Sequence, residues 1–91
     1  MNMDEVYQQL RIFEQSLNHF ADALNLAWHD IETHHNQLDP RWQDEYQRRY
    51  MALWEPLSEQ LNAYRTRDLP MHLDLLKRKI SLAEEYLQGP V

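Results

Sequence analysis

The chain has 91 residues, with a single glycine, no cysteine and a formal net charge of −6. This length fits one domain, and one glycine leaves almost nothing for the positive-φ turns of β-hairpins, which excludes an all-β fold. The absence of cysteine excludes disulfide scaffolds and Cys-ligated zinc, and the acidic balance argues against a nucleic-acid-binding protein. With 43% apolar residues, the chain is too hydrophobic for a disordered tail. The composition therefore predicts one small all-α domain.

A seven-residue apolar repeat begins at the third residue. It predicts a helix over residues 4–36, because apolar positions spaced alternately three and four apart form one stripe along a helix. The first set of positions is Met3, Leu10, Leu17, Leu24, Ile31 and Leu38. The second set, three residues later, is Val6, Phe13, Phe20, Ala27 and His34. Tyr7, Ala21 and Trp28 widen the stripe, which favours a helix bundle over a two-stranded coiled coil.

The Asp39-Pro40 pair predicts a hinge at residues 37–40. Pro40 disfavours helical geometry at the residue before it, while Asp39 can cap a new helix that has proline at its first position. A connection this short predicts a second helix, over residues 41–66, that runs antiparallel to the first. Pro56 lies inside this helix, and we expect a kink there rather than an end, because the apolar pattern continues beyond it.

After Tyr64 the apolar pattern skips five residues to Leu69, and Pro70 follows at once. Residues 69–88 are predicted to be either a bent continuation of the second helix or a separate third helix, and Gly89-Pro90 ends it. In the first case the chain is an antiparallel hairpin that pairs as a four-helix bundle. In the second it is a three-helix bundle that is stable as a monomer. We favour the hairpin.

In a hairpin folded at Asp39, Trp28 is expected near Tyr50 and Leu24 near Trp54. With Tyr46 close by, this places an aromatic cluster beside the hinge. Tryptophan and tyrosine contribute strongly to protein interfaces, so we predict a protein-binding surface rather than a catalytic site. The predicted interface residues are Leu10, Phe13, Leu17, Phe20, Leu24, Trp28, Ile31, Trp42, Tyr46, Tyr50 and Trp54. Ile12 and Leu26 lie off the main stripe and suggest a second, smaller contact patch.

Around the hinge the sequence has Trp42-Gln43-Asp44, with Tyr50 eight residues after the tryptophan. A tryptophan at a helix–helix turn followed by an aromatic residue about eight positions later resembles the WXG-motif family. The resemblance implies a small helical hairpin, usually dimeric, that is exported by a type VII secretion system or serves as a partner within one. Asp44 stands where the family motif has glycine.

These patterns predict a non-enzymatic interaction module. Its partner is a second copy, as a homodimer, or a larger protein, such as a component of a secretion-type or ATPase-driven system. No cofactor is expected. An alternative function comes from Glu32 and His35, which have the Glu-x-x-His spacing that places two metal ligands on one helix face. Two copies of this motif in a symmetric dimer would form a metal-binding four-helix bundle.

Two short basic clusters, Arg65 with Arg67 and Lys77-Arg78-Lys79, alternate with acidic residues. Mixed charges of this kind are typical of solvated helix faces, which also argues against nucleic acid as a partner. The sequence shows neither a cleaved signal peptide nor an apolar run of the roughly 20 residues needed for a membrane span. We therefore expect a cytoplasmic protein, whose export would need a route without a cleaved signal.

Overall fold

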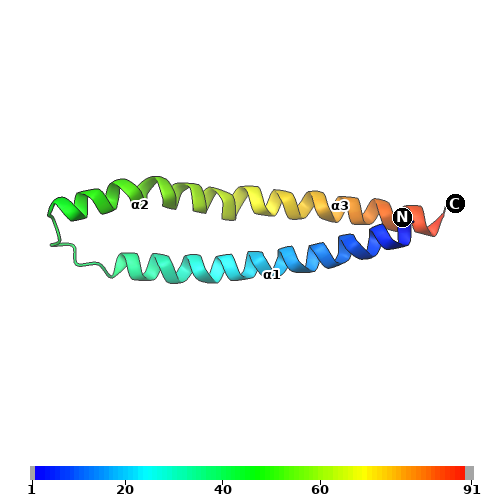
Figure 1. The fold of residues 1–91 in the computed structure, drawn as a ribbon, viewed down its shortest axis with the longest axis horizontal. Coiled ribbons are helices and arrows are strands. Elements are labelled where there is room, and N and C mark those ends of the chain that lie inside the picture. The colour runs from blue at the N-terminus through cyan, green and yellow to red at the C-terminus, as the bar shows by residue number, and fades with distance from the viewer. Residues whose placement is uncertain (1, 90–91) are drawn as a thin grey trace.

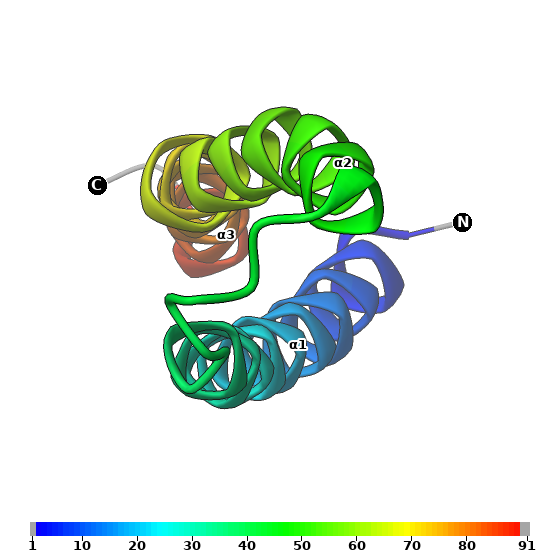
Figure 2. The ribbon, with the colours of Figure 1, turned by 90° about the vertical axis from the view of Figure 1, so that its left-hand side faces the viewer.

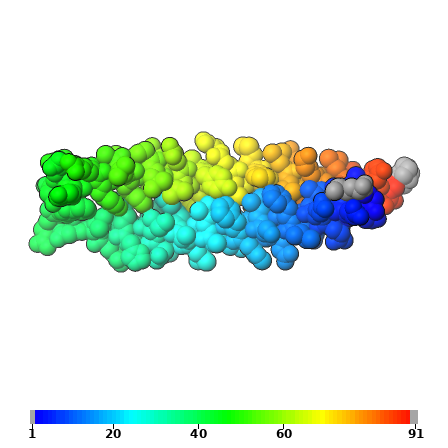
Figure 3. Space-filling model, viewed as in Figure 1, coloured from blue at the N-terminus to red at the C-terminus, as the bar shows by residue number. Residues whose placement is uncertain are grey.

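The computed structural model describes residues 2–89 and shows an antiparallel helical hairpin (Figure 1). The first arm is α1 (Met3–Asn36). The second arm consists of α2 (Glu45–Ala63), the π-helical turn η1 (Tyr64–Asp68) and α3 (Leu69–Gln88), which follow one another without a break. No strand occurs within residues 2–89. The predicted all-α class and hairpin are thus confirmed, in a rod of 68 × 22 × 17 Å (Figure 3).

The connection between the arms is longer than predicted, because the residues expected to begin the second helix form a turn instead. The backbone N–H of Trp42 donates to the carbonyl of Asp39 at 3.0 Å, which closes a β-turn with Pro40 at its second position. The Asp39 carboxylate accepts from the backbone N–H of Arg41 at 2.9 Å and from its guanidinium. These bonds hold the pKa of Asp39 below its usual value. Asp39 is therefore a turn residue, and its predicted role as a helix cap is wrong.

Asp44 caps α2 in place of Asp39. Its side-chain oxygen accepts from the backbone N–H of Gln47 at 2.9 Å, so that α2 begins at Glu45 rather than at residue 41. The helix then continues through Pro56, as expected, and the arm curves gently along its length (Figure 1).

The five-residue skip in the apolar pattern is taken up by η1. In this turn the backbone N–H of Leu69 donates to the carbonyl of Tyr64, five residues earlier, which adds one residue to a helical turn. A regular α-helix would rotate Leu69 about 80° away from Leu61, whereas the extra residue reduces the difference to about 20°. Both side chains can then face α1. The expected third helix is therefore a continuation of the second arm, and the three-helix bundle is wrong. Gly89 follows α3 with a φ of 78°, and Pro90 lies outside the described residues.

The core lies at the end of the hairpin away from the hinge, where α1 and α3 pack closely. The buried side chains among the described residues all belong to α3: Leu69, Leu76, Ile80 and Ala83. Near the termini, the Tyr7 hydroxyl donates to Glu84 at 3.0 Å, and this bond raises the pKa of Tyr7. The backbones of α1 and α2 stay farther apart, and the arms cross when viewed along the rod (Figure 2).

The register of the two arms differs from the expected one by about one helical turn. Trp28 lies against Trp54 rather than Tyr50, with ring centroids 6.3 Å apart, and Tyr50 lies against His35. The shift follows from the longer hinge, which moves the start of α2 four residues along the chain.

Candidate functional site

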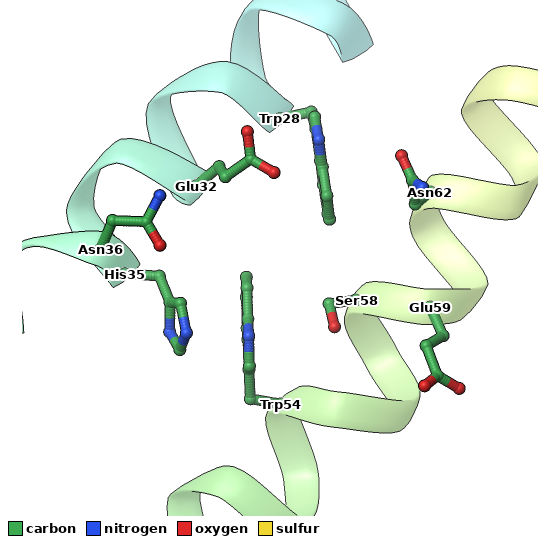
Figure 4. A pocket seen from close by; sticks show the side chains of 8 residues that line it. All are labelled: Trp28, Glu32, His35, Asn36, Trp54, Ser58, Glu59 and Asn62. Carbon is green, nitrogen blue, oxygen red and sulfur yellow. The ribbon is translucent and has the colours of Figure 1, made fainter.

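An aromatic cluster fills the space between α1 and α2, where the arms are farthest apart. We define the aromatic cluster as Trp28, His35, Trp42, Tyr50 and Trp54. The rings of Trp28 and Trp54 are nearly parallel, 7° apart, and His35 stacks on Trp54 with centroids 4.3 Å apart. His35 and Trp28 lie on opposite sides of the Trp54 ring (Figure 4). The cluster thus joins the arms where their backbones do not meet.

Tyr50 and Trp42 extend the aromatic cluster toward the hinge. The Tyr50 ring lies 6.3 Å from that of Trp54 and 5.9 Å from that of Trp42. The tyrosine hydroxyl is also 2.7 Å from the Nδ1 atom of His35. Tyr46, which was predicted to belong to this cluster, is 72% exposed and packs only under the guanidinium of Arg49. Its inclusion in this cluster is wrong, since Tyr46 has no part in the ring contacts that join the arms.

His35 is a member of the aromatic cluster that the sequence analysis considered only as a metal ligand. A signal for it exists, because His35 lies seven residues after Trp28 and so continues the set of Tyr7, Ala21 and Trp28. His34, which was placed in the apolar stripe, is exposed, and its imidazole lies 2.9 Å from the Asp30 carbonyl. At this end of α1, the position that faces the other arm is therefore His35 and not the expected His34.

The first set and the set beside Trp28 face the second arm. Their half-buried members include Leu10, Leu17, Leu24, Tyr7 and Trp28. The second set lies to one side, where Phe13 and Phe20 remain 46% and 47% exposed. Thus the predicted interface residues divide into two groups. One group packs inside the hairpin, and the other forms an uncovered surface.

The uncovered surface is one side of the hairpin, formed by both arms. The ring of Phe13 lies 5.9 Å from His72, and that of Phe20 lies 6.4 Å from Tyr64. We call this side the open face. Its exposed apolar and aromatic residues include Phe13, Phe20, Ile31, Leu38, Leu57, Tyr64 and Leu75.

Two cavities hollow the open face. One, of about 340 Å³, lies between Phe13 and Leu75, with Lys79 at its border. The other, of about 380 Å³, lies beside the aromatic cluster and is lined by Ile31, Leu38 and Trp42, among others. Both are lined mainly by apolar and aromatic side chains.

The opposite side of the hairpin is polar. It contains a cavity of about 260 Å³ between Trp28 and Trp54, bordered by Glu32 and Asn62 (Figure 4). Arg65 lies close to this cavity. Its guanidinium donates to Asn25 at 2.9 Å and to Asn62 at 2.7 Å, and it lies 5.6 Å from the centre of a Trp28 ring. The prediction that Arg65 lies on a solvated face is wrong, because the side chain bridges the two arms.

The other basic residues do lie on exposed faces. Arg67 pairs with Asp68 at 3.0 Å, and Arg78 pairs with Asp74 at 3.0 Å, all with largely exposed side chains. Ile12 and Leu26 are 62% and 73% exposed on α1. Leu26 lies two residues after Leu24, which puts it about 200° around the helix, away from the second arm.

Glu32 and His35, the predicted metal ligands, both border the polar-side cavity but point to different parts of it (Figure 4). The imidazole of His35 is engaged by Trp54 and Tyr50. Within residues 2–89, no group of three or more His, Cys, Asp or Glu side chains is placed to hold a metal ion.

Comparison with protein-family models, with curated proteins and with solved structures finds no match to this chain. Among the described helices, none is long and apolar enough to cross a membrane.

Proposed function

We propose that this protein is a non-enzymatic helical interaction module that binds another protein through its open face. The observation that supports this most strongly is the unequal burial of its apolar side chains. Only four side chains of the described residues are buried, whereas Phe13, Phe20 and Leu57 are about half exposed on one side of the rod. Exposed apolar surface of this extent marks an interaction site in a small protein.

Two helices cannot cover each other's broad apolar stripes, so the proposed complex is a helical bundle. A second pair of helices laid along the open face would enclose Phe20 and Tyr64 and fill the two cavities beside them. Four helices around one core is a common way to satisfy such stripes. The partner in this proposal is a second copy or a helical segment of a larger protein.

Photocrosslinking in the cell that makes this protein tests the proposal. A photoreactive phenylalanine analogue would replace Phe13 on the open face or, as a control, Gln15, which is exposed on α1 and faces away from Phe13. We expect one discrete protein adduct from position 13 and little from position 15, because only the open face is covered in the complex. Equal adduct yields from both positions would contradict the proposal.

The WXG resemblance supports a more specific hypothesis, that the partner belongs to a secretion-type or ATPase-driven machine. In its favour, Trp42 lies in the turn between the arms and contacts Tyr50, eight residues later. The absence of any family match leaves this hypothesis resting on the resemblance alone. The identity of the protein crosslinked at position 13 tests it directly.

A further inference from the structure

We propose that the open face is covered by a second copy of this chain, with Phe20 and Tyr64 at the centre of a twofold interface. This inference rests on the proposed function and names the partner of the same surface. Three features support a second copy: the area left exposed, the position of the Phe20–Tyr64 pair, and the charge of the open face.

The exposed area is larger than that of a compact protein of the same size. The chain has an accessible surface of 7429 Å² for a mass of 11.1 kDa. A compact monomer of this mass exposes about 5,700 Å². Two copies thus expose roughly 3,500 Å² in excess, within the range of about 2,000–5,000 Å² that obligate homodimers bury. Pairing with one further copy is therefore enough to reduce the accessible surface per chain to that of a compact protein of this mass.

The Phe20–Tyr64 pair lies halfway along the rod. Phe20 is at the middle of α1 (Met3–Asn36), and Tyr64 is near the middle of the arm that runs from Glu45 to Gln88. A twofold axis perpendicular to two equal rods that lie along each other passes near their midpoints. Each copy then places its pair against the same pair of the other copy. The rings already meet edge to face, at 62°, and four such rings shielded from water would form the energetic centre of the interface.

The two cavities of the open face are lined by few charged residues although the chain has a net charge of −6. Apart from histidines and Tyr50, the ionisable side chains that line them are one carboxylate, Asp30, and one ammonium, Lys79. Two open faces can therefore meet without bringing the negative charge of the chains together. The remaining acids, among them Glu32 on the polar side, stay in contact with water.

Sedimentation equilibrium of the purified chain tests this inference with two matched variants. Phe20→Ala removes a ring from the centre of the open face, and Leu26→Ala removes an exposed apolar side chain from the other side of the same helix. The wild type is expected to have twice the mass of one chain. Phe20→Ala should raise the dissociation constant about 30-fold, the usual effect of losing a central interface residue, and Leu26→Ala should leave it unchanged. Far-UV circular dichroism shows whether each variant keeps its helices.

A wild type that keeps the mass of one chain up to about 1 mM would overturn the inference. So would a dimer that both substitutions weaken equally, since its interface would then lie elsewhere. If Phe20→Ala unfolds, Leu57→Ala takes its place, since it removes a half-exposed apolar side chain of the open face from the other arm, and it should weaken the dimer with the helices intact. A monomeric chain that still gives an adduct from position 13 in the cell would refute the second copy while leaving the open face as a site for a different protein.

Discussion

Trp54 joins the two arms at the hinge end because it has a contact on each side of its ring. His35 stacks on one side at 4.3 Å, and Trp28 lies on the other (Figure 4). Tyr50 adds an interaction with the same histidine. The backbones of α1 and α2 do not pack closely, so these side chains supply the attraction between the arms there.

Replacing Trp54 with alanine should destabilise the hairpin by about 2 kcal/mol, less than for a fully buried tryptophan because this one is half-buried. Tyr46→Ala is the matched control, since Tyr46 is an exposed aromatic residue of the same helix, and its effect should stay within about 0.5 kcal/mol. Urea unfolding at one fixed protein concentration measures both. Equal losses would show that Tyr46 belongs to the aromatic cluster after all.

The sequence could predict that Trp28, Tyr50 and Trp54 cluster between the arms. It could not predict which of these rings face each other. Their helical spacing places them on inner faces, while the pairing depends on where the hinge ends, and that is decided by Asp39 bonding to Arg41 instead of capping α2. Arg65 could not be predicted as a bridge. Its contacts, with Asn25 in particular, come from the other arm and leave no pattern in the local sequence.

Of the helices, α1 follows most directly from the sequence. Its heptads extend over almost the whole helix, and its observed bounds, Met3–Asn36, differ from the predicted 4–36 by one residue. The second arm was ambiguous, because a five-residue skip followed by proline is compatible with either a break or a π turn. Only the packing of α3 on α1 decides between a break and a π turn. The π turn keeps Leu69 facing inward, and the burial of Leu69 stabilises that arrangement.

The π turn predicts that one residue can be removed from it without loss of the fold. Deleting Thr66, together with Pro70→Ala to restore a donor N–H, should convert η1 to regular α-helix and keep α3 in phase with α1. Deleting Arg78, an exposed residue of α3, should instead rotate Ile80 and Ala83 about 100° away from α1. Thermal unfolding should stay cooperative for the first variant and be lost for the second. If both variants unfold alike, η1 does not have the phase-keeping role assigned to it.

At the scale of the whole molecule, the hairpin is a rod with one apolar side, one polar side and its buried core at the end away from the hinge. The polar side holds Glu32, Asn62 and the Arg65 bridge, and the open face holds the Phe20–Tyr64 pair. This division was only partly predictable. The sequence marks which residues of α1 are apolar, but the crossing of the arms decides which of them the second arm covers (Figure 2).

If two open faces cover each other, two rods lie side by side in the proposed dimer. Small-angle X-ray scattering in solution tests this arrangement most directly, since it gives the mass and the longest dimension together. We predict the mass of two chains and a longest dimension close to the 68 Å of one hairpin, because face-to-face pairing adds thickness and not length. Two chains with nearly twice that length would mean end-to-end association through the hinge. That result, or the mass of one chain at every concentration, would contradict this arrangement.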